Sequence, residues 1–479
     1  MPDHPSRALY DELMRRSLSA FTAHAFSALE ASRRFVPSAF LDLVASRVED
    51  VLSGAVTRQI LNLPPRHLKS FIVSVSGIAW GLGHKPSSKI ILVSYSSDLV
   101  EKCIRQIRQI LNADWYRALF PQTRLSGDKN TASHFETSKG GGVFGTTIEG
   151  ALTGLGGDLI IIDDPIKAGD VHSAPSRQRV HDWVSETLLS RLDDKETGKV
   201  ILVMQRLHAD DLSGALAEQG GWNHLVLPAI AVTDETIRFG YNRIFQRKQG
   251  EALFPERERL DTLDAIRREI GSVTFEAQYQ QSPVPADGNL LKRAWIQFYA
   301  GLPEPLHTLE VIQAWDLGLK GGETNDYSAC VTAVWIGHTC YVLDLWRGRL
   351  VYPDLKARVI TLAQQHSARR ILIEDATIGT ALVEELLRET GLTVIAVKPD
   401  GAKTDRIVAQ SAKIESGRVL LPDQAPWLSD FDAEYRAFPR GKHDDMLDAL
   451  AYLLRDHDQR VLITDLPVII PRKPLRFDW

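Results

Sequence analysis

The sequence predicts an α/β protein with two domains, the first containing a mostly parallel sheet and the second a mixed sheet. Three observations support this prediction. Short buried-type strands alternate with helical segments from residue 58 to residue 227, residues 282–288 have the composition of a linker, and a strand meander follows the linker. A chain of 479 residues is long enough for two to three domains.

The composition is that of an ordinary globular protein, with 44% hydrophobic and 24% charged residues. No apolar run approaches the roughly 18 residues that span a bilayer, and the N-terminus lacks a signal-peptide core, so no membrane association is expected. The net charge of -5 argues against static coating of nucleic acid but allows a transient grip through local patches. Cys103, Cys330 and Cys340 form no pairable framework, which predicts a reducing cytoplasm.

The first half is expected to begin with helices and to continue as a parallel sheet. Residues 41–48 carry apolar residues at helical spacing, and we interpret residues 1–55 as a helical lid or adaptor. The alternating segment, residues 56–282, is typical of a sheet with helices on both faces. Its expected strands are 59–63, 89–94, 142–146, 158–162 and 200–204.

The second half has a different order of elements, which predicts a ribonuclease H-like domain over residues 296–457. Three strands come first, and the tight Gly337-His338 turn between the last two predicts an antiparallel meander. We place a linker at residues 283–295 and a C-terminal tail at 458–479. The expected elements are strands 311–315, 329–336 and 339–346, helix 354–366, strand 371–374, helix 380–389 and strand 393–397.

A phosphate-loop candidate follows the first expected strand of the parallel sheet. Triphosphate binding needs converging backbone N–H groups, a lysine that reaches the β- and γ-phosphates and a hydroxyl for magnesium, and Lys69 and Ser70 supply the last two. Leu63 and Leu68 replace the glycines of the usual G-x-x-x-x-G-K-[ST] pattern. A lysine and a serine after a proline turn also fit a plain helix start. The expected nucleotide-binding residues of this loop are Pro65, Arg66, His67, Leu68, Lys69 and Ser70.

Two aspartates end a central strand of the same domain. Four apolar residues lead into Asp163 and Asp164, and ligand sites in open α/β sheets lie at such carboxyl ends. We expect Asp163 to hold magnesium through water and Asp164 to polarise the attacking water. Gln205 and Arg206 end the next strand, where they are expected to sense the γ-phosphate. Candidates for neutralising charge in the transition state, each of which also fits a structural role, are Arg66 and Arg191.

Acidic residues at three element ends of the second half form a candidate metal site. Two magnesium ions about 3.5–4 Å apart need several carboxylates from different elements to bind a scissile phosphate and activate water. We expect Asp316 on the first meander strand, Glu374 at the end of its neighbour and Asp445 to form the catalytic set. Like charges this close are unfavourable unless a cation lies among them, although one of these acids also fits a helix cap. The acids that open the last helix, among which the metal ligand is left open, are Asp444, Asp445 and Asp448.

The order of these motifs resembles that of the large subunit of a tailed-phage or prophage terminase, the DNA-packaging motor. Relatives in gene-transfer agents share the same motifs. The similarity extends from Phe35 to Leu454. It rests on NLPPRHLKS at 62–70, GLGGD at 154–158 leading into IDDP at 162–165, QRLHADDL at 205–212, QYQQSP at 278–283, WD at 315–316, IE at 373–374 and HDDMLDA at 443–449.

The resemblance implies an N-terminal packaging ATPase of the additional-strand P-loop type, which uses ATP and Mg²⁺, and a C-terminal ribonuclease H-like nuclease that Mn²⁺ also supports. It further implies a homo-oligomeric ring, commonly of five subunits, on the portal protein of an empty procapsid in the cytoplasm of the bacterial host. The other implied partners are double-stranded DNA and a small terminase subunit that selects it. Asp164 stands where many motors have glutamate and Gln205 where threonine is common, so these two assignments stay open.

The expected function is ATP-driven translocation of double-stranded phage DNA into a procapsid, with endonucleolytic cutting of concatemeric DNA by a divalent-metal site. One alternative is a DNA-binding scaffold of a decayed prophage, which the presence of Lys69 and all the key acids disfavours. A second alternative is a repair enzyme with fused ATPase and resolvase-like domains, which would prefer branched over linear DNA.

Overall fold

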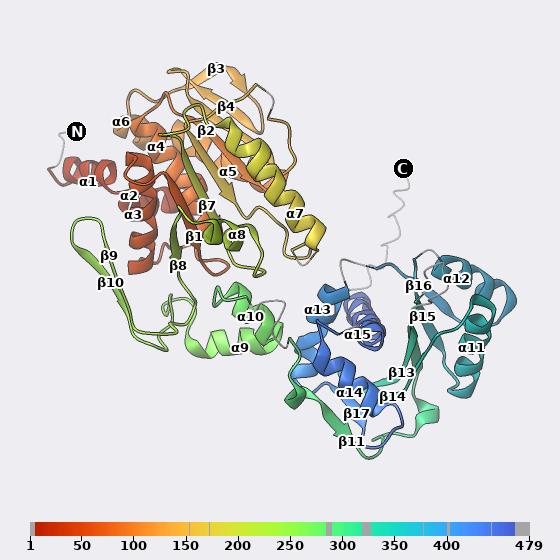
Figure 1. Cartoon of the computed structure of the whole chain (residues 1–479). Coiled ribbons are helices and arrows are strands. Elements are labelled where there is room, and N and C mark those ends of the chain that lie inside the picture. Colours follow the sequence, from red (N-terminus) through yellow and green to blue (C-terminus); the bar gives the residue numbers. More distant parts are fainter. Residues whose placement is uncertain are drawn as a thin grey trace, which may run out of the picture. The chain divides into compact units, whose positions relative to one another are not determined.

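The computed structural model describes residues 5–152, 154–171, 173–283, 290–318, 327–376, 378–399, 403–441 and 443–464. The chain divides into two compact units, Met1–Ala286 and Asp287–Trp479 (Figure 1). The domain boundary expected from the sequence, at residue 282, lies near this division. None of the helices in the described ranges is long and apolar enough to cross a membrane.

One eight-stranded sheet forms the centre of the first unit, in the order β3-β4-β5-β2-β6-β7-β1-β8. The sheet is mostly parallel, as predicted, and its two antiparallel pairs are β3 with β4 and β4 with β5. All five expected strands are present, whereas β3, β4 and β8 were missed because they lie toward the edges and have mixed polar sequences. The strands are β1 (Arg58–Asn62), β2 (Lys89–Ser94), β3 (Leu125–Asn130), β4 (His134–Thr137), β5 (Gly142–Thr147), β6 (Leu159–Asp163), β7 (Lys199–Met204) and β8 (Asn223–Val226).

Helices cover both faces of this sheet, which explains why β6 is buried along its whole length. One face packs against α2 (Leu18–Leu29), α3 (Ala39–Ser53), the π-helix η1 (Phe71–Gly77), α4 (Ile78–His84) and α5 (Ser97–Asn112). The other face packs against α7 (Ala174–Asp182), the π-helix η2 (Trp183–Leu188) and α8 (Leu212–Gln219).

The N-terminal helices are part of this core and do not form a separate lid. Phe21 on α2 and Phe40 and Val44 on α3 are fully buried in the cluster that also contains Leu61 and Val203 of the sheet. The expected adaptor over residues 1–55 is therefore corrected to a helical layer of the first unit. The remaining elements of this unit are α1 (Pro5–Arg16), α6 (Asp114–Leu119), the hairpin β9 (Glu235–Phe239) and β10 (Arg243–Arg247), α9 (Leu260–Ile270) and α10 (Ser272–Gln278).

A seven-stranded sheet forms the second unit, in the order β11-β17-β14-β13-β12-β15-β16. The predicted antiparallel meander is confirmed in β12, β13 and β14, and β15 and β16 continue the sheet in parallel fashion. This is the expected ribonuclease H-like order. The strands are β11 (Gln297–Tyr299), β12 (Val311–Asp316), β13 (Ser328–Ile336), β14 (Thr339–Gly348), β15 (Arg370–Glu374), β16 (Val394–Val397) and β17 (Val419–Pro422).

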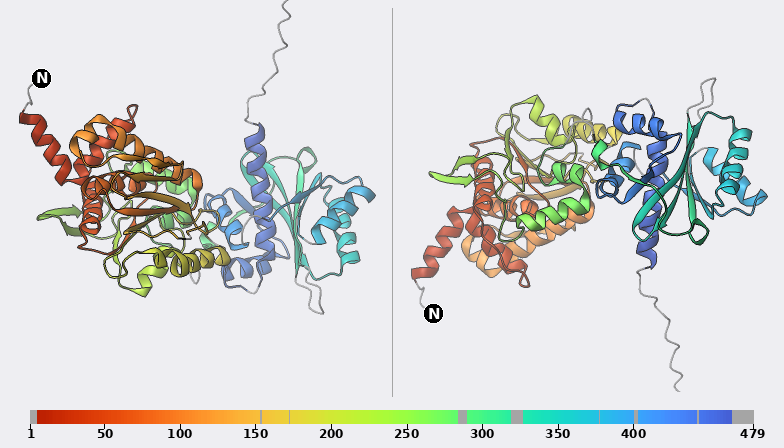
Figure 2. Two further views of the ribbon diagram at one scale, coloured as in Figure 1. Left: turned by 90° about the horizontal axis from the view of Figure 1, so that it is seen from above. Right: turned by 90° about the horizontal axis from the view of Figure 1, so that it is seen from below.

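Two groups of helices enclose the second sheet (Figure 2). On one face, α11 (Tyr352–Gln365) and α12 (Ile378–Glu389) pack over a core that includes Trp315 and Ile373. On the other face, α15 (Asp445–Thr464) packs against β12 and β13, and α13 (Lys403–Glu415) and α14 (Leu428–Ala437) pack against α15. Because α15 continues to residue 464, the expected tail at 458–479 begins as helix, and residues 465–479 lie outside the described part of the chain.

Candidate active sites

The phosphate-loop candidate turns between β1 and η1 without glycine. Arg66 and Leu68 both adopt left-handed backbone conformations, with φ of 62° and 61°. Non-glycine residues in this region store about 1–3 kcal/mol of strain each and tend to persist at functional sites. These two strained residues make the turns of the loop, at positions next to Pro64 and Pro65 and to Lys69.

His67 anchors the loop from inside the protein. Its ring is 1% exposed and packs between Phe40 and Phe254, with ring centroids 5.7 and 5.9 Å away. Nδ1–H donates to the carbonyl of Pro65 at 2.8 Å. Burial lowers the pKa of His67 to about 4, so the ring is neutral at pH 7. The expected role of His67 in nucleotide binding is therefore limited to its backbone, because its side chain belongs to the core.

Lys69 is brought together with the two polar groups expected to face the γ-phosphate. Its Nζ lies 3.4 Å from Oδ2 of Asp164 and donates to Oε1 of Gln205 at 3.3 Å. The lysine is only 6% exposed, so its charge is compensated mainly by Asp164. Asp164 has a left-handed backbone with φ of 44°, and its N–H donates to the carbonyl of Val203 at 3.0 Å.

Asp163 receives two hydroxyl groups from the same helical face. Ser70 Oγ donates to Oδ1 at 2.9 Å, and Ser74 Oγ donates to Oδ2 at 2.6 Å. Burial, and after it the charge of Asp164, raise the pKa of Asp163 to about 6 against the opposing effects of the two hydroxyls and Lys69. Sequence analysis missed Ser74, although its four-residue spacing from Ser70 is the signal that would have found it.

Arg206 holds the loop that follows β7. Its Nε lies 2.9 and 3.0 Å from the two carboxylate oxygens of Asp211, and its Nη2 donates to the carbonyls of His208 and Ala209. These contacts hold the guanidinium in the loop, and the expected contact of Arg206 with the γ-phosphate stays a prediction. Arg191, another candidate, donates from Nε to the carbonyl of Thr187 at 3.4 Å. Arg66 is exposed on the phosphate loop, and its carbonyl accepts from Arg257 at 2.7 Å.

In the second unit, adjacent parallel strands bring two of the expected acids to one edge of the sheet. Trp315 of β12 pairs with Ile373 of β15, and the next residues along the two strands are Asp316 and Glu374. Burial is the main cause that raises the pKa of Asp316 and Asp448, and the negative charge of Glu374 adds a smaller contribution to both.

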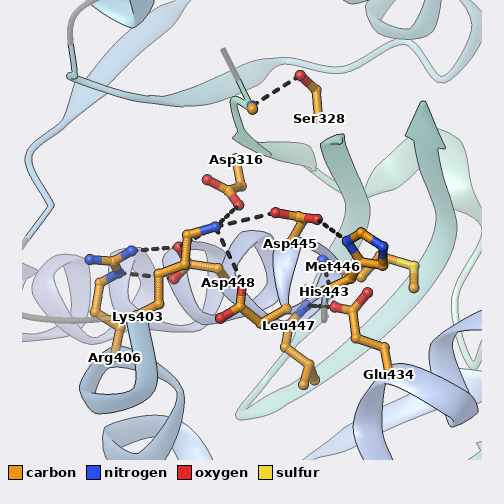
Figure 3. Close-up of polar contacts among 12 residues, drawn as sticks. Asp316, Ser328, Lys403, Arg406, Glu434, His443, Asp445, Met446, Leu447 and Asp448 are labelled. Carbon is orange, nitrogen blue, oxygen red and sulfur yellow. Dashed lines mark hydrogen bonds and ion pairs between the residues drawn. The ribbon is translucent and has the colours of Figure 1, made fainter. Parts of the chain in front are cut away.

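A glutamate from another helix fixes the start of α15. Glu434 of α14 is 5% exposed, and its Oε1 accepts from the backbone N–H groups of Met446 and Leu447 at 2.8 and 3.0 Å (Figure 3). Burial raises the pKa of Glu434 to about 7. Sequence analysis considered an aspartate of 444–448 as the cap of this helix. The cap is instead Glu434, which leaves Asp445 in the first turn available for other contacts.

Lys403 at the start of α13 lies among the carboxylates (Figure 3). Its Nζ donates to Oδ2 of Asp316 at 2.7 Å and to Oδ1 of Asp445 at 3.3 Å. Carboxylate oxygens of Asp444 and Asp448 lie 3.4 and 3.9 Å away. Sequence analysis required a cation among these acids and missed the lysine that provides it. The sequence signal for this lysine is the three-residue spacing between Lys403 and Arg406, which puts two basic residues on one helical face.

Asp448 is paired separately. Nε of Arg406 lies 2.9 Å from Oδ1, Nη2 contacts Oδ2, and the side chain of Asp448 is 0% exposed. A buried two-point pair of this kind neutralises the carboxylate. Of the three acids that the sequence left as alternative metal ligands, Asp448 is held mainly by Arg406, whereas Asp444 and Asp445 lie nearer to Lys403, at 3.4 and 3.3 Å.

Burial sets the electrostatics of the cluster. It raises the pKa of Asp316 well above its ordinary value, against the opposing charge of Lys403, and it raises the pKa of Asp445 in the same way. Burial acts to lower the pKa of Lys403, but the surrounding aspartates, with Asp316 foremost, raise it overall. The arrangement thus favours a positive charge at this position.

The donor set suits a hard divalent cation, because Mg²⁺ prefers carboxylate oxygens from separate elements. In the described residues no group of three histidine, cysteine, aspartate or glutamate side chains is arranged to hold a metal ion. The reason is visible in the geometry: the oxygens of Asp316 and Asp445 point at the ammonium of Lys403, which occupies the point of convergence. The carboxylates therefore fit a cation, and a metal ion requires the lysine to move.

These features define a class of protein in which an α/β unit with a phosphate loop precedes a ribonuclease H-like unit with clustered carboxylates. Residues 313–456 match the family model described as the terminase RNaseH-like domain. This match lies within the second unit, and the resemblance of the chain to a terminase large subunit is confirmed.

Solved structures of large terminases share the fold of both units. The large terminase of a thermophilic bacteriophage (crystal form 2) is 11% identical with a TM-score of 0.51, and the match covers 86% of this chain and 98% of that chain. The same phage protein in complex with ATP-gamma-S is 11% identical with a TM-score of 0.50, covering 85% of this chain and 98% of that chain. A search of curated protein sequences finds no significant match.

Proposed function

We propose that this terminase large subunit hydrolyses ATP in its first unit to translocate double-stranded DNA into a procapsid, and cuts concatemeric DNA with a divalent-metal site in its second unit. The observation that carries the proposal is the convergence of Asp316 and Asp445, from different elements of a ribonuclease H-like unit, on one cation. Such convergence is what a metal-dependent nuclease needs and what a plain structural role does not.

In the first unit, the contacts of Lys69 suggest how nucleotide binding prepares hydrolysis. The β- and γ-phosphates compete with Asp164 for the ammonium of Lys69, which lies 3.4 Å from the carboxylate. When the lysine turns to the phosphates, Asp164 is released to orient the attacking water and accept its proton. Ser70 and Asp163, already hydrogen-bonded to each other, would hold the magnesium ion that accompanies ATP. Magnesium neutralises developing charge on the phosphates.

In the second unit, Asp316, Glu374 and Asp445 would hold the metal, and Asp444 lies close enough to assist. A divalent ion bound there polarises the scissile phosphate and lowers the pKa of a bound water. Glu434 positions this site indirectly, because it holds the first turn of α15, which carries Asp445. Mg²⁺ is the expected ion, and Mn²⁺ should replace it because both accept oxygen ligands.

The partners proposed for this chain follow from the terminase class. They are double-stranded DNA, a small terminase subunit, a portal protein on a procapsid and further copies of the chain in a ring, commonly of five, in the cytoplasm of a bacterial host. The surface charge agrees with transient DNA contact, since a net charge of -5 suits a moving grip better than a static coat.

The test is a paired assay on the purified full chain. ATP hydrolysis is measured with and without linear double-stranded DNA, and plasmid cleavage is measured with Mg²⁺ or Mn²⁺. We expect DNA-stimulated hydrolysis and metal-dependent cutting. Absence of both activities in a folded protein would favour the decayed scaffold, and preferential cutting of branched over linear DNA would favour the repair enzyme.

A further inference from the structure

We propose that Lys403 is an internal cation that occupies the carboxylate cluster of the second unit until a divalent metal ion displaces it. The inference rests on the proposed nuclease function and adds a step to it. Metal binding at this site is then an exchange of one cation for another. The resting nuclease is held in a metal-free form by its own lysine.

The position of the ammonium requires such an exchange. Its nitrogen is 2.7 Å from Asp316 and 3.3 Å from Asp445, and it contacts the same oxygens that the proposed metal would take. Mg²⁺ binds oxygen at about 2.0–2.1 Å and carries twice the charge of the lysine. Two cations that share these oxygens repel each other strongly in a partly buried site, so the more weakly bound cation, the ammonium of Lys403, must leave.

The two basic residues of α13 differ in whether they can leave. The side chain of Lys403 is 37% exposed and therefore has a path to solvent. The side chain of Arg406 is 7% exposed and is held at two points by Asp448. Arg406 is thus a permanent partner of one acid, and Lys403 is a removable partner of the others.

After displacement, the ammonium of Lys403 can contact DNA. Once it leaves the cluster, Lys403 carries a positive charge at the rim of the site, where the scissile DNA strand would bring phosphate groups. Lysine suits this role because its long flexible stem and compact charge allow it to follow a phosphate. The exchange would therefore link metal binding to DNA binding, since DNA phosphates stabilise the displaced lysine.

The first test compares metal affinity in the wild-type full chain and in Lys403→Met, without DNA, by calorimetric titration with Mn²⁺. We expect Lys403→Met to bind Mn²⁺ at least about tenfold more tightly, because the competing cation is gone. In metal-free buffer the same variant should melt at a lower temperature, and added Mn²⁺ should raise its melting temperature more than that of the wild type.

A matched control is Lys356→Met. Lys356 also lies between two acids, Glu385 and Glu389, at 2.7 and 2.6 Å, but on α11 and outside the cluster. Removing it should leave the Mn²⁺ affinity at the wild-type value. A tighter affinity in both variants would show a general charge effect and would overturn the inference.

The second test uses the wild-type chain and does not depend on a variant that folds. The accessibility of Lys403 is measured by reductive methylation of lysines followed by mass spectrometry of the peptide that contains it. Methylation of Lys403 should be slow in metal-free buffer and faster with Mn²⁺, while Lys356 stays unchanged. Equal affinities in the first test, or equal methylation in the second, would overturn the exchange and leave the nuclease proposal intact. If wild type and Lys403→Met both fail to bind Mn²⁺, the proposed metal nuclease fails, and the exchange fails with it.

Discussion

Arg406 and Asp448 form a buried two-point ion pair directly beside the carboxylates that face Lys403. The pair separates the acids of the second unit into two functional kinds. Asp448 holds α13 against α15, whereas Asp316 and Asp445 are the proposed metal ligands.

This division predicts different outcomes for two neighbouring substitutions. Asp448→Asn removes the negative charge that faces the buried guanidinium of Arg406, so the variant should lose about 3–5 kcal/mol of unfolding free energy. Asp445→Asn should keep most of the stability but lose Mn²⁺ affinity. Chemical denaturation and calorimetric titration of both variants check this. Normal stability of Asp448→Asn together with lost Mn²⁺ binding would assign Asp448 to the metal.

Glu434 is expected to support the nuclease site through the helix that it caps. Glu434→Ala removes the acceptor of two buried backbone N–H groups and should cost about 1–3 kcal/mol. Glu434→Gln retains an acceptor oxygen and should retain most of the stability. Thermal melting of the two variants measures the difference, and an equal loss in both would show that the negative charge of Glu434, and not its hydrogen bonds, is what matters.

His67 should make the stability of the first unit depend on pH. Its pKa is near 6.5 in the unfolded chain and is lowered to about 4 by burial, so the folded state favours the neutral ring. Its contribution is full above pH 6.5 and is lost as the pH falls toward 4, by up to about 3 kcal/mol. Denaturation curves of wild type and His67→Gln between pH 4 and pH 7 test this. The contributions of the other titrating groups to the unfolding free energy are common to both proteins and cancel in the comparison. Parallel curves would contradict the assignment.

Lys69→Ala should abolish ATP hydrolysis and leave Mn²⁺-dependent DNA cleavage largely intact. The substitution removes the ammonium that pairs with Asp164 at rest and with phosphate in the proposed nucleotide complex. Lys89→Ala is the control, because Lys89 is an exposed lysine at the opposite, N-terminal end of a strand in the same sheet. Loss of both activities in Lys69→Ala would indicate misfolding or one shared site.

Much of this architecture is encoded locally and could be predicted. The apolar run of β6 and the turn at Gly337 have strong local patterns, and both the parallel sheet and the meander are confirmed. The acids at strand ends were found for the same reason, since a charge after a buried run stands out. Ser74 and Lys403 have only a helical spacing as a local signal and Glu434 has none, because each acts on a residue that only the tertiary fold brings near.

The left-handed residues of the phosphate loop show another limit. Leu63 and Leu68 stand where the usual loop has glycines, which suggested a departure from that loop. No local sequence pattern predicts that Arg66 and Leu68 adopt positive φ. Contacts from distant residues, such as Arg257 to the carbonyl of Arg66, help to hold this conformation. Strain of this kind is set by the surrounding fold, which sequence periodicity does not describe.

The central proposal is that the carboxylates of the second unit form a metal-dependent cutting site separate from the ATP site. The direct measurement is plasmid cleavage with Mn²⁺, run beside ATP hydrolysis, for Asp316→Asn and for the control Asp344→Asn, whose carboxylate pairs with His366 at 3.0 Å on the same sheet. We predict that Asp316→Asn loses cleavage and keeps wild-type ATP hydrolysis, while Asp344→Asn keeps both. Full cleavage by Asp316→Asn would contradict the account.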